Sequence, residues 1–345
     1  MRVLVAMSGG VDSSVAAALL AAEGHEVVGA TMKLWAGAGD SGCCSVGDVD
    51  DARRVADELS IDHRVFNFTD EFDRDVVEPY VAEHARGRTP NPCVECNRMV
   101  KFGHLAARAR RLGFDALATG HHARVVREGG WLALRRGADR AKDQSYVLST
   151  LCAADLADVV MPIGNLTKSA VRALAVRFGL RTAAKPDSQD VCFITAPSPR
   201  LGRSVFLAQR IPLHPGRVVD VGTGAELATL EAIELVTVGQ RRGLGVAHGE
   251  RRYAVGVDVA SSTVFAGAAG DLLTGGVAFS RRTWFDAPVP VGSKVHVQVS
   301  AHGPERPAVV TAEGIEFRRP ERRVAPGQVV ACYLGDRVVG SGIAG

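Results

Sequence analysis

The stretch "RVLVAMSGGVDSS" (Arg2–Ser14) decides the fold of the first half of this chain. Residues 2–7 form a short, mostly apolar run, which is typical of a parallel strand buried on both faces. Ser8, Gly9 and Gly10 follow, and residues 13–22 are predicted to form a helix. Glycine lets the backbone approach an anion closely, and the start of a helix offers free N–H groups. The stretch therefore predicts a strand, a phosphate-binding loop and a helix.

The loop differs from a Walker A loop. It contains no Gly-Lys-Ser/Thr, which the Walker A class requires, so β- or γ-phosphoryl transfer by that machinery is not indicated. The hydroxyl groups of Ser13 and Ser14 are expected to add hydrogen-bond donors. The alternative interpretation is an ordinary glycine-rich turn, which the position between a strand and a helix disfavours.

Strand and helix patterns alternate outward from this stretch to about residue 200. "HEVVGATMKLW" (His25–Trp35) is predicted to be a second strand, and "DVDDARRVADELSI" (Asp48–Ile61) has apolar residues at helical spacing behind an acidic first turn. A later helix is predicted to begin near Thr167. This alternation predicts an open, doubly wound α/β parallel sheet over residues 1–203.

The sequence pattern changes after residue 203. Short β-rich runs such as "IELVTV", "KVHVQVS" and "RVVGSGI" are separated by Gly, Pro and Asp turns. We predict two small all-β domains here, 204–262 and 263–345, built as small barrels.

The chain has 345 residues, long enough for two or three domains. No apolar run approaches about 18 residues, so we expect neither a signal peptide nor a membrane span. Seven cysteines at irregular spacing indicate a reducing cytoplasm, with thiols that are free, metal-bound or catalytic. Cys152 and Cys332 lie in apolar runs and are expected to be core residues. Cys43 and Cys44, in a Gly/Ser loop, are interpreted as structural.

Charge is unevenly distributed along the chain, although the formal net charge is only +3. Residues 86–111 carry seven Lys/Arg against Glu95 alone. A polyanion could bind such a basic segment. The alternative is that these side chains only solvate helix faces.

"TPNPCVECN" (Thr89–Asn97) contains two cysteines, Cys93 and Cys96, at the spacing of half a zinc knuckle. A second close Cys/His pair does not follow in the expected place. His121 and His122 also suggest a metal, but adjacent residues on a strand are expected to point to opposite faces. Spacing alone therefore leaves the role of the two cysteines open.

The segment Ser8–Ser13, Ser-Gly-Gly-x-Asp-Ser, resembles the PP-loop of the N-type ATP pyrophosphatases, which have the adenine nucleotide alpha hydrolase-like fold. That family cleaves ATP to AMP and pyrophosphate and uses the adenylate to activate a carbonyl oxygen. The resemblance implies ATP with Mg²⁺, and implies that Asp12 helps to hold the magnesium pyrophosphate. The implied ATP-binding residues are Ala6, Met7, Ser8, Gly9, Gly10, Val11, Asp12, Ser13, Met32 and Gly120.

Eight ordered blocks extend the resemblance over nearly the full length. They are "GCCSVGDVDDARRVADEL", "TPNPCVECNRMVKF", "ATGHHARV", "KDQSYVL", "PIGNLTKSAVR", "KPDSQDVCFI", "VGQRRGLG" and "PGQVVACYLGD". Together they resemble the tRNA-specific 2-thiouridylase family. The resemblance implies ATP-dependent 2-thiolation of the wobble uridine (U34) of tRNA by a sulfurtransferase. It also implies a persulfide donor, such as a cysteine desulfurase or a sulfur-relay protein.

The same resemblance assigns roles to individual residues. Cys96 would be the nucleophile, and Cys192 would carry the sulfur as a persulfide and form a transient disulfide with Cys96. The residues implied to contact the target base or the tRNA are Asn91, Pro92, Cys93, His121, Lys142, Asp143, Gln144 and Gln328.

The chain departs from the family pattern in three places. Many members have Asp where this chain has Cys93, so that Cys93, Cys96 and Cys192 could hold a [4Fe–4S] cluster with one open iron. The alternative is that Cys93 fills space beside the nucleophile. The usual Gly-His-x-Gly of the middle domain is absent, and the Arg-Tyr pair of the last domain is not recognisable in "KVHVQVSAHGPERP". Whether these two domains contact tRNA is therefore open.

The C2 carbonyl of uracil is a poor electrophile, and the implied chemistry activates it. Adenylation of O2 of uracil turns that oxygen into an AMP leaving group, after which a persulfide sulfur can attack C2. Attack of Cys96 on the inner sulfur would leave a disulfide that needs a reductant. Lys101, Arg98 and the first helix are expected to lower thiolate pKa values.

Two alternative functions remain at this stage. One is a small-molecule adenylating ligase or amidotransferase of the PP-loop superfamily. The other is a non-catalytic metal- or RNA-binding protein, which would not explain "SGGVDSS".

Overall fold

The first domain is built on a parallel sheet, as predicted. The structure, a computed structural model, describes residues 1–35, 46–187, 191–194, 199–246 and 251–345. The sheet has the order β3-β2-β1-β4-β7, and all its pairs are parallel. Its strands are β1 (Arg2–Ala6), β2 (Glu26–Lys33), β3 (Asp62–Asn67), β4 (Ala116–Thr119) and β7 (Val159–Val160).

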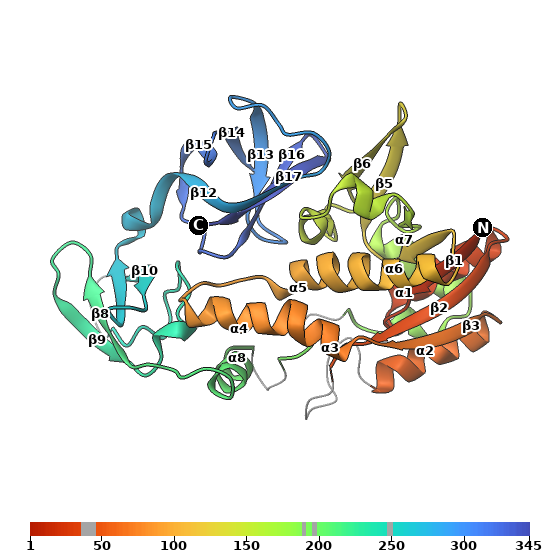
Figure 1. The fold of residues 1–345 in the computed structure, drawn as a ribbon, viewed down its shortest axis with the longest axis horizontal. Helices are drawn as coiled ribbons and strands as arrows, with labels where there is room; N and C mark the ends of the chain where they lie inside the picture. Colours follow the sequence, from red (N-terminus) through yellow and green to blue (C-terminus); the bar gives the residue numbers. More distant parts are fainter. Residues whose placement is uncertain (36–45, 188–190, 195–198, 247–250) are drawn as a thin grey trace.

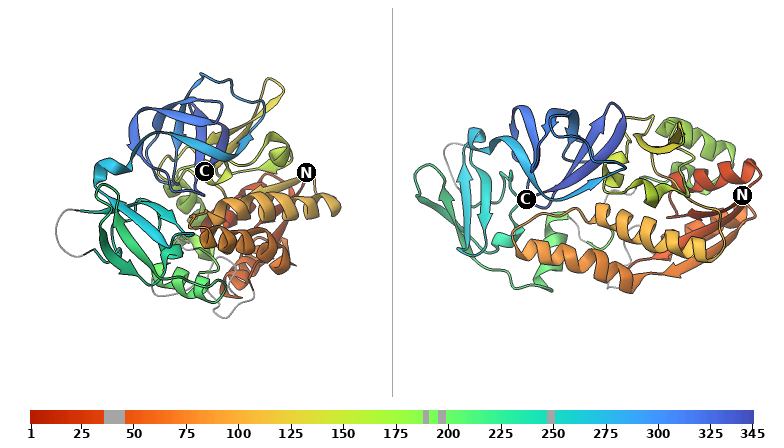
Figure 2. Two further views of the ribbon diagram at one scale, coloured as in Figure 1. Left: turned by 60° about the vertical axis from the view of Figure 1, so that its left-hand side comes forward. Right: turned by 45° about the horizontal axis from the view of Figure 1, so that its top comes forward.

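Helices cover both faces of this sheet (Figures 1 and 2). They are α1 (Val11–Ala22), α2 (Val46–Glu58), α3 (Thr69–Phe72), α4 (Glu78–Ala85), α5 (Pro92–Glu95), α6 (Ala106–Arg111) and α7 (Lys168–Arg177). Short π-helices, η1 (Asp73–Val77) and η2 (Cys96–Leu105), continue α3 into α4 and α5 into α6. Three 3-10 turns follow, η3 (Ser145–Leu148), η4 (Ala153–Leu156) and η5 (Arg181–Ala184).

Alternation along β1 explains the two-sided core. Val3 and Val5 belong to the apolar cluster formed with α1, α2 and α7, whereas Leu4 and Ala6 belong to the cluster on the opposite face. Successive side chains of a strand point to opposite faces, so an almost continuous apolar run is buried on both. The chain moves outward from β1 through β2 to β3 and returns to β4 on the other side of β1. The carboxyl ends of β1 and β4 therefore form a topological switch point, where ligands of such sheets bind.

The rest of the chain is mainly β, as predicted, apart from α8 (Pro199–Ala208) and the 3-10 turns η6 (Ile233–Leu235) and η7 (Ala269–Leu272). A central sheet has the order β10-β11-β8-β9. Its strands are β8 (Gly216–Asp220), β9 (Glu226–Leu230), β10 (Tyr253–Asp258) and β11 (Thr263–Gly267).

The last six strands close into a barrel. They are β12 (Leu273–Trp284), β13 (Lys294–Gln298), β14 (Arg306–Val310), β15 (Gly314–Arg322), β16 (Val329–Leu334) and β17 (Arg337–Ala344). Strand β12 pairs with both β15 and β17, which closes the ring. Cys332 is fully buried in the barrel core, as expected.

Domain limits were expected after residues 203 and 262. Helix α8 crosses residue 203, and β11 lies beyond residue 262 yet pairs with β8 and β10. Because those three strands share one sheet, we propose that the central domain ends between β11 and β12. In the described residues, no helix is long and apolar enough to cross a membrane.

A hairpin of the first domain joins the barrel, which the sequence did not predict. Strands β5 (Ala123–Glu128) and β6 (Trp131–Arg136) pair with each other, and β6 meets β17 at Arg135 and Arg337. Arg136 is only 3% exposed and lies over the Tyr333 ring, 3.5 Å from its centroid. This cation–π contact ties the first domain to the barrel.

Hydrogen bonds complete this contact. The Arg136 guanidinium donates to the Asp143 carboxylate at 2.8 Å and to Oε1 of Gln298 at 2.7 Å. The pair is buried from solvent, so neither charge can be hydrated if the other is removed.

We expect Arg136→Ala to lower the free energy of unfolding by about 3–5 kcal/mol, because the Asp143 carboxylate would be left buried without its countercharge. Urea denaturation followed by circular dichroism measures this change. Arg140→Ala is the control, since the Arg140 side chain is 56% exposed and its ion pair with Glu305 should contribute at most about 1 kcal/mol. Equal unfolding midpoints for the two variants would show that the contacts of Arg136 with Tyr333 and Gln298 do not hold the domains together.

Candidate active site

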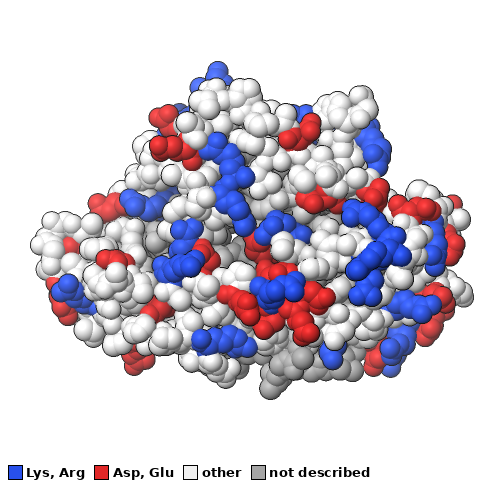
Figure 3. Space-filling model, in the orientation of Figure 1, with Lys and Arg blue, Asp and Glu red and all other residues white. Residues whose placement is uncertain are grey.

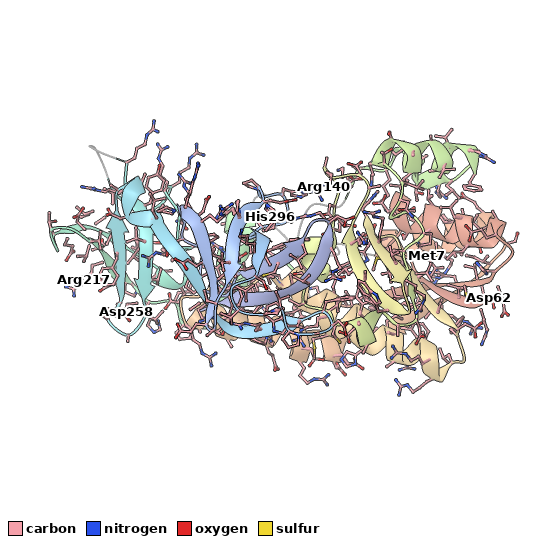
Figure 4. The ribbon with its side chains drawn as sticks, turned by 90° about the horizontal axis from the view of Figure 1, so that it is seen from above. Met7, Asp62, Arg140, Arg217, Asp258 and His296 are labelled. Atoms are coloured by element: carbon pink, nitrogen blue, oxygen red, sulfur yellow. The ribbon has the colours of Figure 1, made fainter. Side chains whose placement is uncertain are left out.

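A cavity of about 750 Å³ opens at the switch point of the sheet. Its walls come from the loop after β1, from the end of β2 and from the residues after β4. In Figure 4, Met7 lies between the N-terminal strand–helix layer and the β5–β6 hairpin. Of the residues expected to bind ATP, all but Gly9 line this cavity: Ala6, Met7, Ser8, Gly10, Val11, Asp12, Ser13, Met32 and Gly120.

The backbone conformation and packing at residue 9 explain why it is glycine. Its φ is +68°, and a Cβ there would lie 2.4 Å from the carbonyl oxygen of Asp48. Only glycine can take this conformation without strain and leave room for the start of α2. Gly9 thus shapes the loop although it does not line the cavity.

The hydroxyls of the two serines of the loop donate hydrogen bonds within the loop. Ser13 and Ser14 both donate their hydroxyl hydrogens to the carbonyl of Gly10, at 3.2 and 2.8 Å. Ser14 is fully buried. In this structure both hydroxyls therefore brace the first turn of α1, and Oγ of Ser13 also accepts from the Ser8 N–H at 3.3 Å.

Gly120 fixes the opposite wall. A Cβ at this position would lie 2.5 Å from the backbone nitrogen of Ser13 and 2.6 Å from the carbonyl carbon of Asp12. The segment after β4 therefore packs directly on the first turn of α1. This packing brings His121 and His122 to the cavity.

Both histidines line the cavity, but their rings contact different elements. His121 lies beside Lys101 and Phe102 of η2, whereas His122 lies beside Asp12 of α1. Burial, with the nearby Lys101 ammonium adding to it, lowers the pKa of His121 well below its usual value. The ring is therefore neutral, with Nδ1 2.9 Å from the Thr119 hydroxyl and Nε2 3.5 Å from Nζ of Lys101.

Four charged side chains form a chain across the cavity. Nζ of Lys168 donates to both carboxylate oxygens of Asp12, at 2.8 and 2.7 Å, and lies 2.8 Å from Asp187. Lys142 donates to Asp187 at 2.8 Å. Burial alone would raise the pKa of Asp12, but hydrogen bonds from His122 and Lys168 hold it below its usual value.

Asp187 is similarly held as a carboxylate. Its burial opposes ionisation, but hydrogen bonds from Lys142 and Lys168 lower its pKa to about 2. Lys168 and Asp187 were not singled out from the sequence, although both lie within the quoted blocks "PIGNLTKSAVR" and "KPDSQDVCFI". Two carboxylates, two ammonium groups and a loop of backbone N–H groups fit a nucleotide with its Mg²⁺, since Mg²⁺ is usually held by one or two carboxylates plus phosphates.

Cys96 lines the same cavity. It begins η2, directly after the short helix α5, whose start is capped by Asn91: the side-chain oxygen accepts from the Cys93 N–H at 3.1 Å. Lys101, one turn further along η2, also lines the cavity. Arg98 instead pairs with Glu95, so Lys101 is the better-placed cation to favour a Cys96 thiolate.

Cys192 lies in a tight turn, where the Ile194 N–H donates to the Val191 carbonyl at 3.0 Å. The next residue, Phe193, anchors this turn in an aromatic cluster. Its ring centroid lies between 5.0 and 6.1 Å from those of four other rings: Trp35, Phe72, Tyr80 and Phe206.

Tyr80 connects the two cysteine segments. Its ring packs on Phe193, with 5.4 Å between the centroids, and it lines the same cavity as Pro92, the residue before Cys93. Burial raises the pKa of Tyr80 to about 12. Pro92, Val191 and Ile194 border one further cavity. The Cys192 turn and the start of the Cys93–Cys96 segment are therefore neighbours.

The three cysteines do not fit a preformed iron–sulfur site. Across the described residues, which include all three, no group of three or more His, Cys, Asp or Glu is arranged to hold a metal ion. Cys43 and Cys44 lie outside the described residues.

The residues expected to contact tRNA divide into two groups. Lys142, Asp143 and Gln144 all line the cavity. The Asp143 carboxylate also accepts from Arg136, the Gly137 N–H and Ser145, and the residue is only 7% exposed. Asp143 is therefore engaged inside the protein. Gln328, from the barrel, donates its side-chain amide to the Thr89 carbonyl.

Basic residues do not form an unbroken belt on the surface. Arg86 and Arg88 pair with Glu83, and Arg110 pairs with Asp158, partners that lie outside the segment 86–111. On the face shown in Figure 3, Lys and Arg are interspersed with Asp and Glu. The barrel also contributes Ala301 and His302 to the cavity wall, a contribution that the sequence did not predict.

We expect Lys168→Met to weaken ATP binding about 10- to 100-fold, because a charge-assisted hydrogen bond contributes roughly 1.5–3 kcal/mol. Equilibrium dialysis with labelled ATP measures this. Arg177→Met, an exposed position on the same helix α7, is the matched control and should bind ATP as the wild type does. Wild-type affinity in Lys168→Met would remove Lys168 from the nucleotide site.

Three family models match the chain in order. They are described as a tRNA methyl transferase HUP domain at residues 1–196, a tRNA methyl transferase PRC-barrel domain at 204–268 and an aminomethyltransferase beta-barrel domain at 276–344. A solved structure, the U34-tRNA thiolase NcsA from Methanococcus maripaludis with its [4Fe-4S] cluster, is 17% identical and has a TM-score of 0.37 over 60% of this chain and 64% of that chain. Similarity at that level supports no argument.

Full-length relatives are far more similar. The tRNA-specific 2-thiouridylase MnmA of Mycobacterium sp. (strain KMS) is 47% identical over 363 residues, covering 99% of this chain and 98% of that protein. The protein of the same name from Geobacter metallireducens is 45% identical over 355 residues, covering 99% and 96%. With this identity over the whole length, and with the PP-loop and Cys96 lining one cavity, the chain belongs to the tRNA-specific 2-thiouridylase (MnmA) family.

Proposed function

We propose that this protein uses ATP to replace O2 of the wobble uridine (U34) of tRNA with sulfur, giving 2-thiouridine, AMP and pyrophosphate. The observation that carries this proposal is that Cys96 lines the same cavity as the nucleotide loop. A sulfur-handling thiol beside an adenylating site is what thiolation of a carbonyl requires. The names of the full-length relatives support the same substrate and reaction.

The first step is adenylation. The backbone of residues 8–11 and the start of α1 hold the triphosphate, and O2 of the uracil attacks the α-phosphorus, so that pyrophosphate leaves. Mg²⁺, when bound, neutralises the charge that develops on the leaving pyrophosphate. A bound nucleotide with its metal would supply negative phosphates and a positive metal ion. The Asp12 carboxylate could then bind the metal in place of the Lys168 ammonium, and Lys168 could bind a phosphate in place of the Asp12 carboxylate.

The second step is sulfur transfer. The terminal sulfur of a persulfide on Cys192 attacks C2, and AMP leaves. The Cys96 thiolate then attacks the inner sulfur, which breaks the S–S bond and releases the thiolated base. A Cys96–Cys192 disulfide remains, and an external thiol reductant must reduce it before the next turnover. This requirement agrees with a reducing cytoplasm.

The base has to leave its stack to reach the cavity. A uridine in the single-stranded anticodon loop can be splayed out at small cost. Lys142 and Gln144 stand at the cavity and Gln328 fixes the segment before Asn91, so we assign contacts with the target nucleotide to this region. Asn91, Pro92 and Cys93 remain the proposed base-contacting residues.

Two other functions explain less. A small-molecule adenylating ligase of the PP-loop superfamily would not need Cys96 in the nucleotide cavity. It would also not need a second cysteine, Cys192, in a turn next to the Cys93–Cys96 segment. The family models are described by methyl transfer, but methyl transfer would leave both the ATP loop and the thiols unexplained.

We expect Cys96→Ser and Cys192→Ser each to reduce tRNA thiolation by more than about 100-fold, since each removes a group that bonds to the transferred sulfur or its carrier. The assay combines unmodified tRNA, ATP and a persulfide donor, and mercury-containing gels retard the thiolated product. Cys152→Ser is the matched control and should retain activity. Thiolation by Cys192→Ser with a persulfide donor would contradict the relay.

A further inference from the structure

A second cavity of about 530 Å³ lies between the first domain and the central domain. Its walls come from α4, from the segment before α5, from the Cys192 turn, from α8 and from the loop before β10. Among the described residues, none lines both this cavity and the nucleotide cavity. The proposed function uses only the nucleotide cavity, so the purpose of this second space is unassigned.

The second cavity borders the sulfur-carrying turn. Val191 and Ile194, which flank the Cys192–Phe193 pair, both line it, and so does Pro92 at the start of α5. Cys96, in contrast, lines the nucleotide cavity. A reagent in the second cavity can therefore approach the Cys192 turn without occupying the space needed by ATP and the base.

The cavity carries positive charge. Arg203 and Arg242 line it. Arg203 is fixed in place, because its guanidinium donates to the Leu235 carbonyl at 2.8 Å. Arg242 is exposed to solvent at the mouth. Two guanidinium groups beside apolar walls favour a ligand that has one anionic group and is otherwise uncharged.

A buried acceptor also faces this region. His84 lines the cavity and is 1% exposed, and its Nδ1 lies 3.4 Å from the Glu234 carbonyl, so Nδ1 carries the hydrogen. Burial, with Arg203 adding to it, lowers the pKa of His84 to about 4, and the ring is neutral at pH 7. Its Nε2 has no hydrogen-bond partner among the described residues. A buried acceptor without a partner destabilises the protein unless a ligand donates to it.

We propose that this second cavity is the entry through which a cysteine persulfide reaches Cys192. The terminal sulfur of a persulfide is anionic at neutral pH and suits the two arginines. The peptide N–H groups next to the donor cysteine suit an acceptor such as Nε2 of His84. This inference rests on the proposed function, because it supplies the sulfur that the function consumes.

The loading step is balanced without an added oxidant. The Cys192 thiolate attacks the terminal sulfur of the donor persulfide, the S–S bond of the donor breaks, and the donor leaves as a thiolate. Cys192 becomes a persulfide, and no net oxidation occurs. Arg203 and Arg242 stabilise both the entering persulfide and the leaving thiolate.

The test measures loading alone. Glutathione persulfide is mixed with the full-length protein without tRNA or ATP, and mass spectrometry follows the addition of one sulfur atom to the Cys192 peptide. We expect Arg242→Glu to slow this loading about tenfold or more, since reversing a charge at a cavity mouth repels an anionic reagent. Arg241→Glu is the matched control: it makes the same charge change at the adjacent exposed residue, which does not line the cavity, and should load at the wild-type rate.

A second arm separates this inference from the proposed function. Cys192 is first loaded to completion with inorganic polysulfide, and tRNA and ATP are then added for a single turnover. The Arg242→Glu defect is expected to disappear in this arm. If the loaded wild type fails to thiolate tRNA, the proposed function fails while the entry route stands.

Equal loading rates for Arg242→Glu and Arg241→Glu would overturn the inference. It would also be overturned if Arg242→Glu loaded normally but bound tRNA more weakly than Arg241→Glu, because the cavity would then be an RNA site.

Discussion

The close contact between Gly120 and the first turn of α1 is the constraint on which the rest of the site depends. With no side chain at residue 120, the segment after β4 lies against the backbone of Asp12 and Ser13. The loop after β1 and the loop after β4 therefore become two walls of one cavity. Any larger residue would separate the walls and remove His122 from Asp12, whose atoms are now 3.2 Å apart.

Charge is balanced across that cavity. Asp12 and Asp187 are carboxylates because Lys168, Lys142 and His122 donate to them, as the lowered pKa values of both acids indicate. An array with equal numbers of carboxylates and ammonium groups avoids the large cost of burying one sign alone. The same array can be rearranged by a ligand that brings a metal cation and phosphate anions together. Electrostatic preorganisation of this kind is commonly the largest contribution to catalysis.

Local patterns in the sequence predicted the parts that depend on local chemistry. The strand–loop–helix at Arg2–Ser14, the parallel α/β layer and the all-β remainder are confirmed, because apolar periodicity and glycine placement report them directly. The family resemblance is confirmed by the full-length relatives. The placement of Cys96 in the nucleotide cavity agrees with the role predicted for it, and that role stays a prediction.

Long-range partnerships were not predictable in the same way. No local signal shows that Lys168 will meet Asp12, 156 residues away, or that Arg136 will lie over Tyr333. Arg98 was expected to favour a thiolate but is paired with Glu95, a partner three residues away that competes for it. That both histidines after β4 line one cavity was not predicted either, because strand ends are the least certain part of a sequence-based prediction.

The proposed sulfur transfer requires two thiols from distant segments to meet over an adenylated base. Single-turnover reactions with persulfide-loaded protein, quenched with an alkylating agent and digested without reductant, test this directly. We expect a disulfide-linked peptide pair containing Cys96 and Cys192, formed in equal amount with 2-thiouridine and only when both ATP and tRNA are present. Stoichiometric thiolation with both cysteines recovered as alkylated thiols would contradict it.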